Sequence, residues 1–297
     1  MSKLANNIII SFLWLLPATV FAQDLISQRQ GDSLVAALSK DYYETNQHCG
    51  GRGRPAFLCS GITFRGGVPG DYYIWNPSPN SERSGGVSFS YLRTDSKYRR
   101  LAYNYKSGYT VYQVFGGPRD KVDLDYLCFY PVDAATNQRE DSGCGKNRPY
   151  PETSLSCDEQ GVFTAEQWYA QTYNLQGVNK RQTQCGFNVK EGVRNTASNF
   201  YEGIRAMHLL GNESFALQNE IRIKTWPQGI GSSLPIQSFF YTRRSGDAGR
   251  LEAQSYQKDF YEVTGIAIPV IKISLPQTID QDAKFEFSMN DQAINNL

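Results

Sequence analysis

Two periodicities divide the chain into predicted strands and helices. Between residues 57 and 132, apolar side chains recur at every second position in five short runs, separated by Gly-Gly, Ser-Gly and Pro-Ser-Pro sequences. A period of two predicts strands, and the intervening sequences are typical of turns. The five runs are 62–64, 87–91, 101–105, 109–111 and 124–130. The same period returns in residues 221–223, 234–240 and 266–270.

Four other segments follow the helical period. Residues 32–46 and 196–210 place apolar side chains three and four positions apart, and a weaker pattern covers 251–263. A Thr and a Gln three residues apart form a capping-box sequence that opens a fourth helix at 164–174. His208 falls on the apolar face of the helix at 196–210, so we expect it to pack in the core.

The order of these elements is typical of an α+β fold rather than of a regular βαβ repeat. We expect one domain over residues 23–276, with a mostly antiparallel, split sheet and flanking helices. No internal repeat or low-complexity linker divides it. Residues 277–297 are expected to form a polar C-terminal tail.

The first 22 residues have the features of a secretory signal. Lys3 precedes an apolar run at residues 8–16, Pro17 ends the run, and Ala22 closes a signal-peptidase site. The run is shorter than the roughly 18 to 20 residues that a membrane span needs, and no later segment reaches that length. We therefore expect residues 1–22 to be removed from a secreted or periplasmic protein that has no membrane span.

Removal of this segment leaves the chain electrically balanced. The full chain has 30 Lys and Arg and 29 Asp and Glu, and residues 1–22 hold one Lys and no acid, so 29 of each sign are left. A neutral chain lacks the positive surface that binds nucleic acid or an anionic membrane. We expect neither as a partner.

Six cysteines follow the signal segment, and an even number in an exported chain predicts three disulfides. They are Cys49, Cys59, Cys128, Cys144, Cys157 and Cys185. Short spacing favours the pairs Cys49 with Cys59 and Cys144 with Cys157, although other pairings stay open. The chain has two histidines and no Cys-x-x-Cys pair, so we expect no metal site.

Most common catalytic motifs are absent. The chain has no G-x-S-x-G, no H-E-x-x-H and no glycine-rich phosphate loop, which argues against a serine hydrolase, a metalloprotease and a nucleoside triphosphatase. Two predicted strands carry the most suggestive polar residues. Arg65 ends one strand and precedes two glycines, while Ser88 and Ser90 share one face of the next. An Arg fork can hold a pyrophosphate, and small hydroxyls leave room for the ligand.

This arrangement resembles the arginine/serine/glutamate class of ADP-ribosyltransferases and NAD glycohydrolases. In those families an aromatic-Arg strand precedes a Ser-x-Ser strand, and a Glu-x-Glu or Gln-x-Glu strand follows later. Residues 87–93 resemble the second strand, and residues 218–223 resemble the third. More specifically, the mature chain resembles the halovibrin family of secreted bacterial proteins. The segments that carry this resemblance are 59–61, 75–79, 84–93, 218–226, 235–241 and 259–261.

The resemblance implies an ADP-ribosyltransferase-like fold and a toxin-like enzyme that cleaves NAD, as substrate rather than cofactor, to nicotinamide and ADP-ribose. Transfer of ADP-ribose to an acceptor protein is a further outcome that it implies. Glu220 would stabilise the oxocarbenium-like cation on the ribose, and Gln218 would orient the attacking water or acceptor. Arg65 would hold the phosphates, while Ser88 and Ser90 would brace the site.

The aromatic partner and the acid stay open. Either Tyr91 or Trp75 would stack on nicotinamide. Asp123 and Asp125, at the start of the run at 124–130, are the rival acids to Glu220. A conservative substitution of each acid would show which one is catalytic.

The main alternative is a secreted module that binds a carbohydrate or a peptide without catalysis. The chain has 19 Tyr and 4 Trp, which would make good stacking surfaces on a sheet-rich fold. Core packing is the more common use of such residues. An inhibitor or structural protein without a small-molecule site is the third hypothesis. Release of nicotinamide from NAD separates the enzyme from both.

Overall fold

Nine strands in the described part of the chain form one mixed sheet, accompanied by four α-helices. The strands are β1 (Ile62–Gly66), β2 (Val87–Leu92), β3 (Ser107–Val111), β4 (Asp125–Tyr130), β5 (Phe187–Asn188), β6 (Glu220–Lys224), β7 (Ile236–Thr242), β8 (Val270–Ser274) and β9 (Lys284–Phe287). The helices are α1 (Gln28–Tyr43), α3 (Ala165–Trp168), α5 (Val193–Leu210) and α6 (Gly246–Thr264). The computed structural model describes residues 25–49, 56–67, 87–101, 105–112, 125–134, 144, 156–174, 184–189, 193–224 and 235–297.

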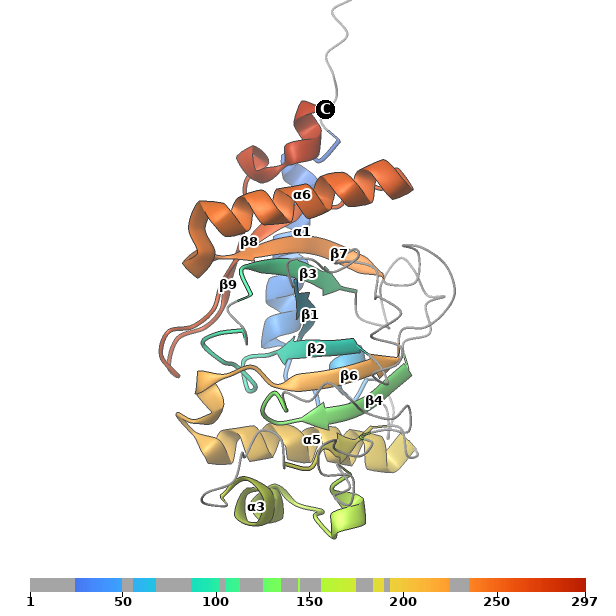
Figure 1. Ribbon diagram of the computed structural model, residues 1–297, viewed down its shortest axis with the longest axis vertical. Coiled ribbons are helices and arrows are strands. Elements are labelled where there is room, and N and C mark those ends of the chain that lie inside the picture. The colour runs from blue at the N-terminus through green and yellow to red at the C-terminus, as the bar shows by residue number, and fades with distance from the viewer. Residues whose placement is uncertain are drawn as a thin grey trace, which may run out of the picture.

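The strand order across the sheet is β5-β4-β6-β2-β1-β3-β7-β8-β9 (Figure 1). Neighbouring strands are antiparallel except β7 and β8, which run parallel and are connected by α6. This arrangement confirms the expected α+β domain with a mostly antiparallel sheet.

Different helices cover the two faces of the sheet. In Figure 1, α6 runs beside β7 at one end, α5 runs beside β4 at the other, and α1 lies behind the centre. The face under α1 buries Leu38 and Tyr42 of that helix against strand residues that include Phe64 and Ile271. The opposite face carries the larger core, which α5 and α6 close.

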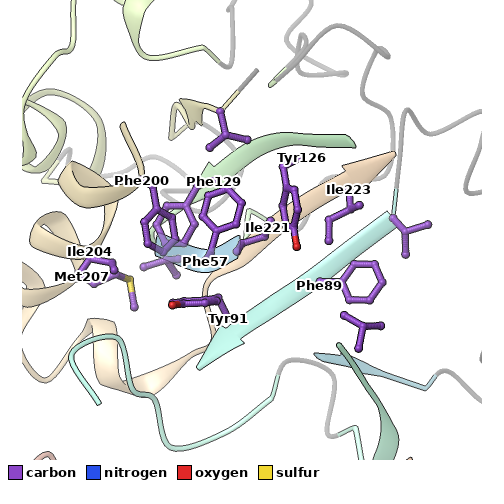
Figure 2. Close-up of a cluster of buried hydrophobic side chains, with 14 of the residues drawn as sticks. Phe57, Phe89, Tyr91, Tyr126, Phe129, Phe200, Ile204, Met207, Ile221 and Ile223 are labelled. Carbon is purple, nitrogen blue, oxygen red and sulfur yellow. The ribbon is translucent and has the colours of Figure 1, made fainter. Parts of the chain in front are cut away.

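Aromatic rings fill the part of this larger core that lies under α5 (Figure 2). Phe200 of α5 meets Phe57, Tyr91 and Phe129 with ring centroids 4.5, 5.2 and 5.2 Å away, each in edge-on geometry. Such pairs contribute beyond their buried area, by about 1 kcal/mol each. Phe200 therefore connects helix α5 to both β2 and β4, beside other buried residues of the helix such as Ile204 and Met207.

Local sequence signals explain the helix ends. The capping box expected at Thr164 and Gln167 is present at the start of α3, and a five-residue π-helical turn continues this helix to Tyr173. Gly265 ends α6 in the left-handed conformation, with φ of 68°. Helix α6 begins at Gly246, earlier than the apolar pattern predicts. Within the described residues, no helix combines the length and the apolar character that crossing a bilayer requires.

Two predicted strands differ from the observed ones. The strand expected at 266–270 begins only at Val270. In the run at 101–105, Leu101 and Tyr105 lie outside any strand, and residues 102–104 lie outside the described part. Leu101 and Tyr105 instead pack against the core under α1. Their alternation reflects burial from a loop, which the sequence pattern does not distinguish from a strand.

The expectation that His208 packs in the core is wrong. His208 is exposed, whereas Ile204 and Met207 of the same helix are buried. Each residue turns a helix by about 100°, so the face centred on Ile204 and Met207 leaves His208 at its margin. Its place in the last turn puts an imidazole beside the negative end of the helix dipole.

Residues 277–297 form part of the domain rather than a tail, which corrects the sequence prediction. Strand β9 pairs antiparallel with β8 and buries Phe285 against α1. The side chain of Asn295 then donates to the carbonyl of Ile26 and accepts from its amide, both at 2.8 Å. The polar character of this segment hid the few apolar residues that anchor it.

The two halves of the sheet meet at a narrow junction. β1 and β2 pair at only three positions, from Ile62 with Leu92 to Phe64 with Ser90. Beyond this point β1 continues its pairing with β3, and β2 continues with β6. The two central strands therefore separate toward Gly66 and Val87.

Three disulfides are present, as expected, but only one predicted pair is correct. Cys49 is bonded to Cys59, whereas Cys128 is bonded to Cys144 and Cys157 to Cys185. The pair Cys144 with Cys157 was wrong because backbone pairing brings distant segments together. The amide of Cys157 donates to the carbonyl of Gly186, and Ser156 forms a bridge with that glycine. Cys185 therefore lies beside Cys157, although 28 residues separate them.

Peptide mapping of the oxidised protein tests this pairing. Proteolysis without reduction should release peptides that join Cys128 to Cys144 and Cys157 to Cys185, because these are the pairs that the fold brings into disulfide contact. Mass spectrometry identifies the joined peptides, and a reduced and alkylated sample is the control. A peptide joining Cys144 to Cys157 as the main species would contradict the structure.

Asp41 links the end of α1 to the start of β1. Its carbonyl accepts from the amide of Gly61 at 2.6 Å. Gly61 has φ of 67°, and a Cβ there would overlap the ring of Tyr91. Burial raises the pKa of the Asp41 carboxyl to about 6, against the opposing charge of Lys40. The folded state therefore binds this proton more tightly than the unfolded state does.

Asp41→Asn should stabilise the protein near neutral pH and have little effect near pH 4. Above about pH 6 the folded chain holds an ionised, half-buried carboxylate, and this cost is relieved as the pH falls through that value toward the unfolded pKa. Partial exposure reduces the expected gain to about 1 kcal/mol. Urea unfolding at both pH values measures it, with the exposed Asp280→Asn as control. An equal effect of Asp41→Asn at the two pH values would refute this account.

Candidate functional site

The three strands that carry the predicted Arg, Ser and Glu are neighbours in the sheet. β1, β2 and β6 lie side by side, although 132 residues separate Ser88 from Glu220. The candidate site lies where β1 and β2 stop pairing, beyond Phe64 and Ser90. The long intervening segment therefore does not prevent the motif residues from meeting.

Glu220 and Ser88 form the centre of the site. The Ser88 hydroxyl donates to Oε1 of Glu220 at 2.6 Å, and the backbone amide of Ala134 donates to Oε2 at 3.0 Å. Glu220 is 2% exposed, while Ser88 is exposed. The carboxylate is therefore withdrawn from bulk water, held by two donors, and approachable from the side of Ser88. Hydrogen bonds to a charged acceptor are among the stronger ones in proteins.

Arg65 reaches the same point from β1. Its Nη1 donates to the carbonyl oxygen of Ser88 at 3.1 Å, across the place where the two strands no longer pair. Arg65 is half-buried. Arg65 thus contacts the backbone of Ser88, whereas Glu220 contacts its hydroxyl. Phe64 pairs with Ser90. Alternation therefore turns the Arg65 side chain away from β1 on the face opposite to Ser88 and Glu220, and the three residues meet only through Ser88.

A second cation accompanies the carboxylate. Arg222 lies two residues after Glu220 on β6, directly opposite Ser88 in the antiparallel register, and is 2% exposed. Alternation along a strand places Glu220 and Arg222 on one face of the sheet. The site therefore has a buried carboxylate and a buried guanidinium on the same face of β6.

Asn219 fixes the position of Glu220. Its fully buried side chain accepts from the amide of Tyr91 at 2.8 Å and donates to the carbonyl of Tyr91 at 2.7 Å. It also donates to the hydroxyl of Ser96 at 2.9 Å. The amide side chain thus takes the place of a backbone partner and extends the pairing of β2 with β6 by one step. Asn219 is a positioning residue for the acid that follows it.

The side chain of Tyr91, the partner of Asn219 on β2, is held by two neighbouring residues. Its hydroxyl donates to the carbonyl of Ser60 at 2.9 Å. The guanidinium of Arg93 lies 5.9 Å from its ring centroid. Arg93 is itself buried and forms a two-pronged ion pair with Asp95, at 2.6 and 2.7 Å. These contacts hold the end of β2 that follows Ser88 in place.

Of the other predicted residues, Tyr91 lies apart from this centre, whereas Ser90 lies on the same face of β2 as Ser88. Tyr91 is fully buried on the opposite face of the sheet, so it offers no ring face to a ligand in this structure, and we assign it to core packing. Ser90 is 2% exposed. Gln218 is buried just before β6, where its carbonyl accepts from the amide of Asp133. Trp75 lies outside the described residues.

The rival acid Asp125 is placed apart from Glu220. Asp125 pairs with Lys224 at one end of the contact between β4 and β6, and Glu220 pairs with Tyr130 at the other end. Four residues of strand correspond to about 13 Å. Asp123 lies outside the described part of the chain. The structure therefore does not bring the two candidate acids into one site.

Sequence reasoning missed three contributors. Asn219 and Arg222 lie within the segment that resembles a Gln-x-Glu strand. The position of Arg222 between Ile221 and Ile223 was an available signal, whereas Asn219 lies between two polar residues and gave none. Ala134 contributes only a backbone amide, for which a sequence carries no signal. In the described part of the chain, no three His, Cys, Asp or Glu side chains are grouped to hold a metal ion.

The chemistry of this arrangement is that of a fixed carboxylate beside cationic side chains. Such a carboxylate can stabilise a positive charge that develops nearby, and its attraction is stronger away from bulk water. Guanidinium groups of neighbouring strands, such as those of Arg65 and Arg222, can hold phosphate. Comparisons with family models, curated proteins and solved structures found no match.

Asn219→Ala should destabilise the fold by about 3 kcal/mol, because it leaves the buried amide and carbonyl of Tyr91 without partners. Urea unfolding followed by circular dichroism measures the change. The matched control is Asn290→Ala at an exposed position, which should stay within about 0.5 kcal/mol of the parent protein. Equal stability of the two variants would show that Asn219 does not fix this strand contact.

Proposed function

We propose that the protein cleaves NAD to nicotinamide and ADP-ribose, with Glu220 as the catalytic carboxylate. The observation that carries this proposal is the contact between Ser88 and Glu220 across two adjacent strands, with Arg65 bonded to the carbonyl of the same serine. The sequence resemblance pairs these residue types in this strand order.

The proposed role of Glu220 follows from the charge of the reaction. The bond between the ribose and nicotinamide breaks, nicotinamide leaves with the bonding electrons, and positive charge develops on the ribose. Because the nicotinamide ring is already cationic, it leaves neutral without a proton. One carboxylate that stabilises the oxocarbenium-like state is then sufficient, in contrast to the carboxyl pair of most glycosidases. A water molecule attacks the ribose and releases its proton.

The remaining side chains would bind and orient the substrate. Arg65 carries a guanidinium for the pyrophosphate, and Ser88 shares a hydrogen bond with the acid on the accessible side. Gln218, two residues before Glu220, keeps its proposed role of orienting the attacking water or an acceptor. Arg222 supplies a second positive charge near the acid.

The finer assignments form part of the same proposal. These are an ADP-ribosyltransferase-like fold, membership in the halovibrin family, a toxin-like role and transfer of ADP-ribose to an acceptor protein. Adjacency of the Arg, Ser and Glu strands supports the fold assignment. Three disulfides support a secreted or periplasmic location.

Nicotinamide release from NAD by the oxidised, purified protein tests the proposal. Glu220→Gln should lower kcat by about a hundredfold or more, because the charge is lost. The glutamine can still accept from Ala134 and donate to the Ser88 hydroxyl, so the variant should fold. Arg65→Ala should raise KM more than it lowers kcat.

Matched variants separate the alternatives. Glu262→Gln removes an exposed carboxylate from α6 and should leave the rate unchanged. Loss of activity in Asp125→Asn but not in Glu220→Gln would move the acid to β4. If the folded parent protein releases no nicotinamide, with or without acceptor proteins, the enzyme proposal is wrong.

A further inference from the structure

A pocket of about 1020 Å³ lies away from the candidate site, at the ends of three strands. The ends of β7 and β8 and the start of β9 form part of it, together with residues 99–101, 105 and 106. In Figure 1, β7 passes into α6 at the left edge, and this connection forms one wall. Six basic side chains line the pocket: Arg99, Arg100, Lys106, Arg243, Arg244 and Lys284.

The positive charge of this pocket is largely uncompensated. Asp282 is the one acidic residue among the described lining residues. It already accepts from Lys97 at 3.3 Å and from the hydroxyls of Tyr42 and Tyr43, each at 3.2 Å. Burial opposes ionisation of Asp282, but the hydrogen bond and charge of Lys97 outweigh it and hold its pKa below the usual value. Within the described part of the chain, none of the six basic residues forms an ion pair.

The backbone that presents these cations is braced. Arg243 and Arg244 lie in the 3-10 turn between β7 and α6, and Ser245 closes this turn. The Ser245 hydroxyl can donate to the carbonyl of Thr242, at 2.7 Å, and to that of Lys106, at 2.9 Å. On the opposite wall, Nε of Arg100 donates to the carbonyl of Ala216 at 3.1 Å. Fixed backbones lower the entropy cost of gathering several cations around one ligand.

The start of α6 adds to this field. Its first residues follow Ser245 directly, and the N-terminal end of a 19-residue helix carries a partial positive charge. The pocket therefore combines guanidinium forks, ammonium groups and a helix N-terminus. This combination is suited to a compact ligand that carries more than one phosphate.

We propose that this pocket binds a small molecule containing a diphosphate group. The volume is that of a small-molecule site, and the chain as a whole has a net charge of only +1, so the cations form a local pocket rather than a general polyanion-binding surface. Leu101, Leu275 and Pro276 supply an apolar wall against which a nucleoside can pack. None of the described lining residues belongs to the NAD site, so this inference is independent of the proposed function.

Calorimetric titration of the full, oxidised protein with inorganic pyrophosphate and with ADP tests the proposal at low ionic strength. Both ligands should bind, and the double change Arg243→Ala with Arg244→Ala should weaken both by about tenfold or more. Lys284→Ala should also weaken binding. The matched control Lys258→Ala removes an exposed lysine of α6 and should have no effect.

The two ligands show whether the pocket recognises a nucleoside diphosphate or the diphosphate group alone. Tighter binding of ADP supports a nucleoside diphosphate and assigns a role to the apolar wall. Equal affinities support recognition of the diphosphate alone. Absence of binding for both ligands overturns the proposal, as does binding that the double variant retains. Binding of a single-stranded oligonucleotide more tightly than ADP, with steep salt dependence, would replace the small molecule with a nucleic acid. Nicotinamide release measured on the same double variant keeps this test separate from that of the NAD site.

Discussion

The side-chain amide of Asn219 sets the geometry on which the candidate site depends. It lies in a fully buried position and pairs with both backbone groups of Tyr91, so a shift in the register of β2 and β6 would leave these groups without their partners. A slip of one residue would turn Glu220 to the opposite face and away from Ser88. The hydrogen bond between Ser88 and Glu220 thus depends on the uncharged pairing of Asn219 with Tyr91 next to it. Arg93 and Ser60 add to this by holding the side chain of Tyr91.

The sequence correctly predicted those elements that are determined by residues close together in the chain. Alternation at 87–91 predicted β2, and the Thr and Gln three residues apart predicted the start of α3. The pairing of Cys157 with Cys185 depends on a backbone bridge to Gly186, and no spacing rule contains that information. The exposure of His208 depends on how α5 is rotated against its core.

The site was predicted in its residue types and only partly in its arrangement. Ser88 and Glu220 meet because their strands are neighbours, and Arg65 reaches only the backbone of Ser88. Tyr91 does not join them, since successive residues of a strand face opposite sides and Ser88 and Tyr91 differ by an odd number of positions. The balanced composition of the chain also concealed a strong separation of charge. Six cations gather in one pocket, while Glu220 and Arg222 share a buried face elsewhere.

The contact between the two ends of the described chain bears on how this protein folds. Helix α1 buries its apolar face against β9, and Ile26 is bonded to Asn295. Of these two segments, the one synthesised earlier therefore waits for the later one, and the core under α1 closes only when β8, β9 and Asn295 are present. Such a high contact order slows folding and lengthens the life of partly folded intermediates with exposed apolar surface. A chaperone that shields α1 during this interval would raise the yield of native protein more than one that acts on the β2–β6 half.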